Sequence, residues 1–123
     1  TKDNHTNLIW SLQTVSGIEW NDATSTAGGS PIAAHNAASR CGFATGWRVP
    51  TRRELLSIVH HGAYLPAIDG AYFPATVDDR YWTNDSYAPF SAAYAWSVGF
   101  SNGVTGAFDK TDTYAVRLVR SGQ

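Results

Sequence analysis

Cysteine is nearly absent from the sequence: Cys41 is the only one among 123 residues. An internal disulfide needs two thiols, so none can form in this chain, and a zinc site built on a pair of thiolates is excluded. We expect Cys41 to be a small buried hydrophobic residue at a helix end. The cellular compartment stays open on cysteine usage alone.

Methionine is missing altogether, and the chain begins at Thr1. A translated protein starts with Met, so we expect a piece of a longer chain or a processed product. Because a signal peptide can be lost with the missing start, its absence from this sequence is uninformative. The sequence also contains no apolar run near the ~20 residues that a membrane-spanning helix needs. We therefore expect no membrane insertion by this domain.

Charge is scarce as well, with nine basic and ten acidic residues and a net charge of −1. This balance gives no electrostatic reason to expect a nucleic acid as partner. Aromatic residues, in contrast, are plentiful: five Trp, six Tyr and five Phe can supply a core. A chain of this length buries roughly two thirds of its unfolded surface. We expect one domain over residues 1–123.

The first part of the chain predicts one strand and one helix. Residues 7–13, "NLIWSLQ", are typical of a strand, and the turn-rich residues 17–31 predict a loop. Alanine-rich residues 32–41 favour a helix, with Pro31 suited to its first turn and Gly42 to its end.

The stretch "GWRVPTRRELLSIV", residues 46–59, has the most regular local pattern. Thr51 and Glu54 have the spacing of a capping box, in which each side chain bonds a free backbone N–H of the first helical turn. Such a cap contributes about 1 kcal/mol. The apolar residues that follow lie on one helical face, and Gly62 would end the helix. The box therefore explains these polar residues without any chemistry.

The last part of the chain predicts an antiparallel meander. After a long loop over 62–80, residues 80–83 indicate the start of a strand, and 84–94 indicate an exposed loop. Residues 94–100, "YAWSVGF", alternate, which predicts one face with Tyr94 and Trp96 and an opposite face with Ser97 and Gly99. Asn102 and Gly103 favour a type I′ hairpin turn, and 114–120 predicts the closing strand. The expected class is α+β.

Five ordered motifs resemble the Lcl C-terminal domain family, named after a bacterial collagen-like adhesin. They are "GWRVPTRRELLSIV" (46–59), "PAIDGAYFPAT" (66–76), "YWTNDS" (81–86), "YAWSVGFSNG" (94–103) and "YAVRLVR" (114–120). The resemblance implies a fold related to C-type lectins and to the formylglycine-generating enzyme. It also implies a bacterial protein that is secreted or held at the cell surface, or a phage-related one.

The sequence departs from this family at several positions. Many members have Trp-Ser-Ser where this chain has residues 82–85, "WTND", and an acidic residue commonly stands at the place of Gly46. Some members have a cysteine at the place of Leu118, and the disulfide that they imply cannot form here. We therefore expect packing to hold the long loops.

An enzymatic function is not expected, and we predict no catalytic residue and no cofactor. The formylglycine-generating relatives depend on a pair of active-site cysteines, which this chain lacks. His60 and His61 are adjacent, so on a helix their side chains diverge by ~100° and cannot easily share a metal. A nucleophile elbow and a phosphate-binding loop are also missing from the sequence.

A calcium site is not expected either. Many lectins use a Trp-Asn-Asp element on a late strand, but here residues 20–22, "WND", lie before the first expected helix. The pairs Asp78–Asp79 and Asp109–Asp112 could supply oxygens, yet calcium takes six to eight converging ligands. We interpret them as solvated turn residues and predict no metal.

Arginine has a structural role in this interpretation. We expect Arg48 and Arg117 to be partly buried and paired, with Glu54 or Asp69 as partners, since a guanidinium satisfies several acceptors at once. An anionic-ligand site is the alternative, but the slightly acidic chain weakens it. The complete set of expected structural residues is Trp47, Arg48, Pro50, Thr51, Glu54, Trp82, Trp96 and Arg117.

The expected ligand-binding surface consists of the 83–94 loop and the late hairpin. Its residues are Asn84, Asp85, Ser86, Tyr87, Phe90, Tyr94, Ser97, Gly99, Ser101 and Asn102. Tyrosine gives large contact area at low entropic cost, and small polar residues adapt to a partner. Exposed loops are ordinarily polar, so an unspecialised loop is the competing interpretation.

Family resemblance adds a possible origin for this composition. Diversity-generating retroelements randomise adenines in Asn codons of lectin-like proteins, some in this family, and the products include Ser, Gly, Asp and Tyr. We expect an extracellular protein or glycan as partner, and the sequence leaves oligomers open. An adhesin module that binds sulfated polysaccharide is the alternative.

Overall fold

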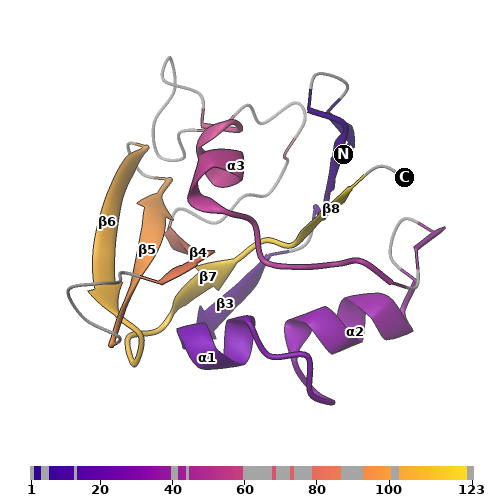
Figure 1. The fold of residues 1–123 in the computed structure, drawn as a ribbon, viewed down its shortest axis with the longest axis horizontal. Helices are drawn as coiled ribbons and strands as arrows, with labels where there is room; N and C mark the ends of the chain where they lie inside the picture. Colours follow the sequence, from indigo (N-terminus) through magenta and orange to yellow (C-terminus); the bar gives the residue numbers. More distant parts are fainter. Residues whose placement is uncertain are drawn as a thin grey trace.

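The computed structural model describes residues 2–3, 6–12, 14–39, 42–43, 45–59, 68, 73, 79–86, 93–100 and 103–121. Its elements in chain order are β1 (Lys2–Asp3), β2 (Leu8–Trp10), β3 (Val15–Ile18), α1 (Trp20–Ala23), α2 (Pro31–Ala37), α3 (Arg52–Leu56), β4 (Arg80–Ser86), β5 (Tyr94–Gly99), β6 (Val104–Asp109), β7 (Tyr114–Val116) and β8 (Val119–Ser121). Short helices and two sheets confirm the α+β class (Figure 1). None of the described helices has the length and apolar character to cross a bilayer.

The larger sheet has the strand order β3-β7-β4-β5-β6, and the smaller has the order β1-β2-β8. Strands β4, β5 and β6 form the expected antiparallel meander. The loop expected over 84–94 was wrong at its start, because β4 continues to Ser86, which pairs with Ala95. Strand β7 was expected to continue the meander but lies on the other side of β4, where Tyr81 pairs with Ala115 in parallel. The chain therefore crosses over between β6 and β7.

The expected single strand over 114–120 is two strands in different sheets. Strand β7 pairs with β3 and β4, whereas β8 pairs with β2. Between them, the Leu118 carbonyl accepts a bond of 3.0 Å from Ser11 N–H. The N-terminal segment thus draws residues 117 and 118 away from the larger sheet, which a one-strand interpretation could not show.

The β5–β6 hairpin forms, but its turn is longer than the expected two-residue type I′ turn. Gly99 pairs with Val104, so four residues connect the strands. Gly103 has a φ of +80° and donates its N–H to the Gly99 carbonyl at 2.7 Å. Phe100 leaves the ladder because its ring is fully buried 4.9 Å from that of Tyr81. Core packing therefore sets the length of this turn.

The expected loop over 17–31 was wrong in its first half. Residues 15–18 form β3 against β7, and Trp20–Ala23 form α1. The helix buries Ala23, and the Trp20 indole N–H donates to the Thr83 carbonyl at 2.8 Å. A tertiary bond to β4 therefore orders a segment whose composition favours turns.

The two helices expected from the sequence are present and shorter than expected. Helix α2 begins at Pro31, after Ser30 accepts a bond from Ala33 N–H at 3.2 Å. Helix α3 spans Arg52–Leu56 and has the complete capping box of Thr51 and Glu54. That prediction is confirmed, and α3 lies over the larger sheet (Figure 1).

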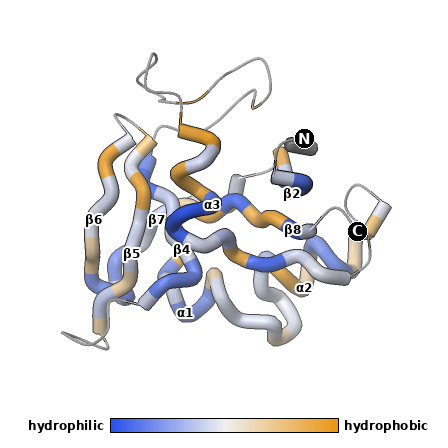
Figure 2. The backbone as a smooth tube through the Cα atoms, turned by 45° about the horizontal axis from the view of Figure 1, so that its top comes forward, coloured by the Kyte–Doolittle hydropathy of each residue, from blue (hydrophilic) through white to orange (hydrophobic). Residues whose placement is uncertain are grey.

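Two apolar clusters lie on opposite faces of the larger sheet, because neighbouring residues of a strand point to opposite sides. Leu55 and Ile58 pack with Tyr81 and Val98 in the first cluster. The second contains Trp82, Ala95 and Val116, together with residues of α1 and α2. In Figure 2, α3 changes from hydrophilic at its start to hydrophobic at its end, and Leu55 at that end belongs to the first cluster. Both faces of this sheet are thus covered, at least in part.

Candidate ligand-binding surface

The start of α3 is fixed by a two-pronged ion pair. The Arg48 guanidinium donates through Nη1 and Nη2 to the two oxygens of Glu54, at 2.6 and 2.7 Å. Glu54 Oε1 also accepts from Thr51 N–H at 2.8 Å, which closes the capping box. These bonds, that from Arg48 above all, lower the pKa of Glu54, and the pKa of Arg48 is raised in turn. The expected pairing of Arg48 with Glu54 is confirmed.

Arg117 is fully buried, more deeply than the partial burial expected. It donates to the Ser11 carbonyl at 2.6 Å and to Thr14 Oγ1 at 3.4 Å, and it lies 5.1 Å from the Phe73 ring centre. Burial lowers the pKa of Arg117. Asp69, the other expected partner, lies outside the described residues. Arg117 is therefore inaccessible to a ligand.

Most of the other residues expected to be structural are buried. Trp47, Pro50 and Trp82 are buried, and the Trp82 indole N–H donates to the Ile18 carbonyl at 2.9 Å. Trp96 differs because its side chain is only partly buried. Its ring lies next to the Arg52 guanidinium at the start of α3.

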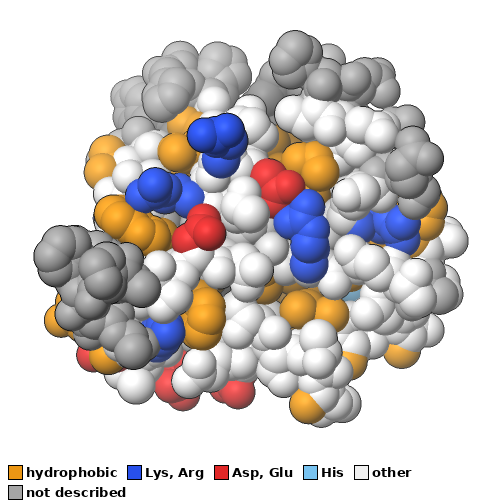
Figure 3. Space-filling view, viewed as in Figure 1, with side chains coloured by type: hydrophobic (Ala, Val, Ile, Leu, Met, Phe, Trp, Pro, Cys, Tyr) orange, Lys and Arg blue, Asp and Glu red, His pale blue; other side chains and the backbone are white. Residues whose placement is uncertain are grey.

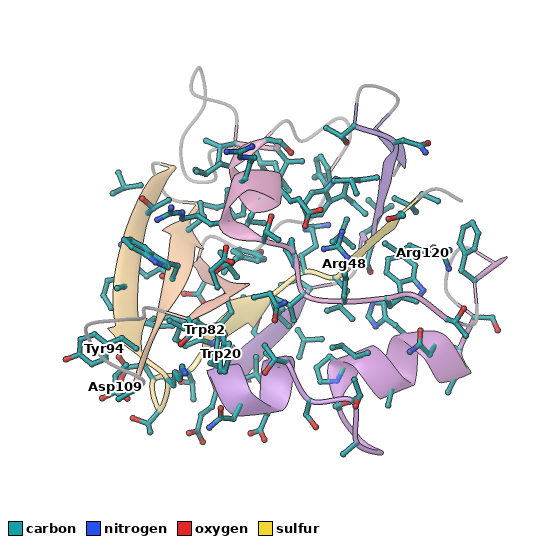
Figure 4. The ribbon with its side chains drawn as sticks, viewed as in Figure 1. Trp20, Arg48, Trp82, Tyr94, Asp109 and Arg120 are labelled. Carbon is teal, nitrogen blue, oxygen red and sulfur yellow. The ribbon has the colours of Figure 1, made fainter. Side chains whose placement is uncertain are left out.

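A surface patch forms where α3 begins above β4 and β5, and we call it the β4–β5 patch. Its residues are Arg52, Asn84, Asp85, Tyr94 and Trp96. Ser86 follows at the end of β4 but lies opposite Ala95, so it points to the other face of the sheet. Asn84 is exposed, and Tyr94 retains 41% of its accessible surface. Figure 4 shows Tyr94 near Asp109 at one end of the sheet, away from Arg48 and Arg120.

Backbone and side-chain bonds hold the patch rigid. Asp85 Oδ2 accepts from Arg52 N–H at 2.6 Å, and Asn84 N–H donates to the Pro50 carbonyl at 2.7 Å. From the buried side, Thr83 Oγ1 donates to the Trp96 carbonyl at 2.8 Å. One expected ligand-binding group, the Asp85 carboxylate, therefore already caps the first turn of α3.

Arg52 is the residue of this patch that the sequence interpretation missed. Its guanidinium carbon lies 4.4 Å from the Trp96 ring centre. A cation at the first position of a helix interacts unfavourably with the helix dipole, so helix stability does not explain an arginine there. The sequence alone shows this unfavourable position of Arg52 at the helix start, and it indicates that the side chain has a role outside the helix.

Two residues of the expected surface are buried, so these predictions were wrong. Ser97 is fully buried; its Oγ accepts from Arg80 Nη1 at 3.2 Å and donates to the Gly106 carbonyl at 3.3 Å. Gly99 is buried too, and a Cβ there would lie 3.5 Å from the Val104 carbonyl oxygen. The alternation gave the two faces correctly, but Arg80 and the second cluster cover the face assigned to solvent.

The face with Tyr94 and Trp96 is covered over only half its length. Val98 and Phe100 are buried in the cluster that includes Leu55 of α3. Tyr94 and Trp96 lie at the other end of β5 and keep accessible surface. The remaining expected ligand-binding residues, Tyr87, Phe90, Ser101 and Asn102, lie outside the described residues.

A polar groove of about 460 Å³ lies elsewhere, between the end of β3 and the start of α2. Its charged lining residues are Glu19 and Asp22, and Ser25, Ser30 and Thr113 contribute hydroxyls. None of the residues expected to bind a ligand lines it. The Trp-Asn-Asp motif forms α1 beside it, and no group of three metal-ligating side chains occurs in the described part of the chain.

Comparison with known protein families gives one match. A family model described as the Lcl C-terminal domain matches residues 1–120. No curated protein matches the chain. The matched range includes α3 with its capping box and all the strands that form the β4–β5 patch. The chain belongs to the Lcl C-terminal domain family.

Proposed function

We propose that this chain is a non-enzymatic recognition domain that binds an extracellular partner through the β4–β5 patch. Its family indicates a surface or adhesin-like module. The site chemistry supports binding over catalysis, since the patch offers hydrogen-bonding groups and aromatic rings. The partner would be a protein or a glycan outside the cell.

One observation supports this proposal most strongly: the Arg52 guanidinium lies on the Trp96 ring. A guanidinium has five N–H donors, and none of those of Arg52 has an acceptor among the described residues. Stacking on the ring pre-orders the side chain, so a ligand that accepts its bonds loses less conformational entropy on binding. Tyr94 adds an exposed aromatic surface at the same sheet end.

We extend this proposal to the fold of the chain, as C-type lectin-like, and to the origin of the patch, as a surface diversified by a retroelement. A C-type lectin-like fold would present the patch as the variable surface of a diversified receptor. Asn84, Asp85 and Tyr94 have the residue types that randomised Asn codons give. Ser97 and Gly99 are no part of this surface, because they are buried.

A polysaccharide-binding adhesin is the second candidate, and the guanidinium of Arg52 favours it. Arginine binds sulfate and carboxylate through paired hydrogen bonds. The charge distribution opposes a long sulfated chain, however. In Figure 3 the Lys and Arg side chains of the visible face are separated by carboxylates and uncharged groups. A sulfated polymer would thus meet no continuous basic surface there.

An array of glycans and purified extracellular protein domains, probed at physiological salt, tests the proposal. We expect wild-type binders to be lost with Tyr94→Ala and kept with Val104→Ala, a change at another exposed apolar side chain. Binding that survives Tyr94→Ala unchanged would contradict the assignment of the patch. The origin is tested separately, since a gene without a neighbouring reverse transcriptase and template repeat would exclude diversification.

A further inference from the structure

Strand β6 ends the larger sheet, and no described strand pairs with its outer edge (Figure 1). Its six residues pair with β5 in an unbroken register from Val104 to Asp109. Just beyond, Lys110 N–H donates to the Ala93 carbonyl at 2.8 Å. Antiparallel pairs alternate between bonded and non-bonded, so the bonded pairs of β6 include Phe108 with Ala95.

This alternation fixes which backbone groups point away from β5. They are the N–H and C=O groups of Thr105 and Ala107 and the N–H of Asp109, whose carbonyl accepts from Asp112 N–H at 2.9 Å. A row of outward donors and acceptors on a regular strand is a template for another strand.

The two edges of the larger sheet differ in how they resist such pairing. At the opposite edge, β3 has a register shift between Val15 and Ile18, and Gly17 within it has a φ of +65°. Irregularities of this kind block edge pairing. Strand β6 contains no proline, lysine or bulge, and Val104 at its start is 52% exposed. Its regularity indicates an edge that is used.

We propose that β6 pairs antiparallel with β6 of a second copy, about a two-fold axis at Ala107. The outward groups bond only if outward residues face one another. An axis at Ala107 joins Thr105 to Asp109 of the second copy, Ala107 to its equivalent, and Asp109 to Thr105. With an axis at Thr105 or Gly106, fewer of the outward-facing residues lie opposite an outward-facing residue of the second copy. An axis at Asp109 would place the two Asp109 carboxylates directly opposite each other, which is unfavourable.

Side-chain chemistry in this register favours a second copy as the occupant. The Thr105 hydroxyl faces the Asp109 carboxylate and can donate to it. Gly106 and Phe108 of the second copy face each other on the other side of the sheet, where the Phe108 ring of the same chain already covers Gly106: a Cβ there would lie 2.7 Å from that ring. The strand is therefore complementary to itself without placing like charges together.

Sedimentation velocity of the intact chain over a wide concentration range tests the pairing. We expect the mass to rise from 13.3 kDa to twice that value. Ala107→Pro removes an outward N–H and should remain monomeric, whereas Ala107→Ser keeps that N–H and should dimerise. A wild-type chain that stays monomeric at every concentration, or an Ala107→Pro variant that dimerises like wild type, would overturn the proposal.

A second variant keeps the test decisive if proline prevents folding. Thr105→Asp places a carboxylate opposite Asp109 of the second copy, so it should be monomeric at low salt, with circular dichroism like that of wild type. Its control, Thr105→Ser, should dimerise. Equal dimerisation of the folded Asp and Ser variants would exclude the register.

Oxidative cross-linking tests the axis itself, in a Cys41→Ser background. Residue 107 faces its own equivalent at about 5.5 Å between Cα atoms, within disulfide range. Ala107→Cys should therefore form a covalent dimer. Val104→Cys should not, because its equivalent lies roughly 20 Å away along the strands. Cross-linking at 104 but not at 107 would contradict the axis.

Discussion

Arg52 stacks on Trp96, with 4.4 Å between its guanidinium carbon and the ring centre, and the two residues come from different elements. The Asp85 carboxylate fixes the backbone of Arg52 from a third element, β4. A cation, an aromatic ring and a carboxylate are thus held by a helix start and two strands. Sites on such elements are more precise than sites on loops.

The capping box predicts a stability effect without an effect on binding. Thr51→Ala removes the acceptor of Glu54 N–H, a bond of 3.2 Å, and should lower the free energy of unfolding by about 1 kcal/mol. Thr51→Ser keeps an equivalent oxygen and should stay near wild type. Urea denaturation of the three proteins measures this. An unchanged midpoint for Thr51→Ala would mean that the box contributes nothing.

Acid should weaken the fold through Glu54. Its folded pKa is lowered, chiefly by the hydrogen bonds from Arg48, so its contribution is full above the unfolded pKa and is lost as pH falls through the lower folded pKa. The loss should begin as pH falls toward the ordinary Glu pKa of about 4.3 and should continue below it.

Denaturant titrations across that range, on wild type and Glu54→Gln, measure this contribution. The variant should be less stable at neutral pH, and the difference should shrink in acid. Glu19→Gln is the control, since the Glu19 carboxylate forms no ion pair in the described part of the chain. A difference that stays constant down to acid pH would contradict the role of the ion pair.

Burial of Ser97 predicts that two serines respond differently to the same change. Ser97→Ala leaves Arg80 Nη1 and the Gly106 carbonyl without this partner and should cost roughly 1–2 kcal/mol. Ser86 is exposed, and Ser86→Ala should change the free energy of unfolding by less than about 0.5 kcal/mol. Thermal unfolding compares them. Equal small effects of the two substitutions on the free energy of unfolding would contradict the burial of Ser97.

Local sequence signals predicted local structure well. The capping box, the start of β4 and the alternation of β5 depend on neighbours within one turn or one strand, so the sequence carries them directly. The pairing of Arg48 with Glu54 belongs to the same class, since the two residues are only six positions apart along the chain.

The remaining features depend on contacts between distant segments. Nothing near residue 115 indicates that β7 pairs in parallel with β4 or that Ser11 draws Leu118 away from the larger sheet. The burial of Ser97 has the same origin, because alternation gives two faces without showing which one Arg80 covers. Arg52 was missed because its partner, Trp96, lies on a strand far along the chain.

Calorimetric titration with a ligand recovered from the array tests the assignment of the patch most directly. Arg52→Gln removes a guanidinium that would donate charge-assisted bonds, so the dissociation constant should rise roughly tenfold to a hundredfold. Lys110→Gln removes a cation that lies 4.2 Å from the Trp20 ring, outside the patch, and should leave the constant near wild type. Equal affinities for wild type and Arg52→Gln, or a loss confined to Lys110→Gln, would contradict recognition through the β4–β5 patch.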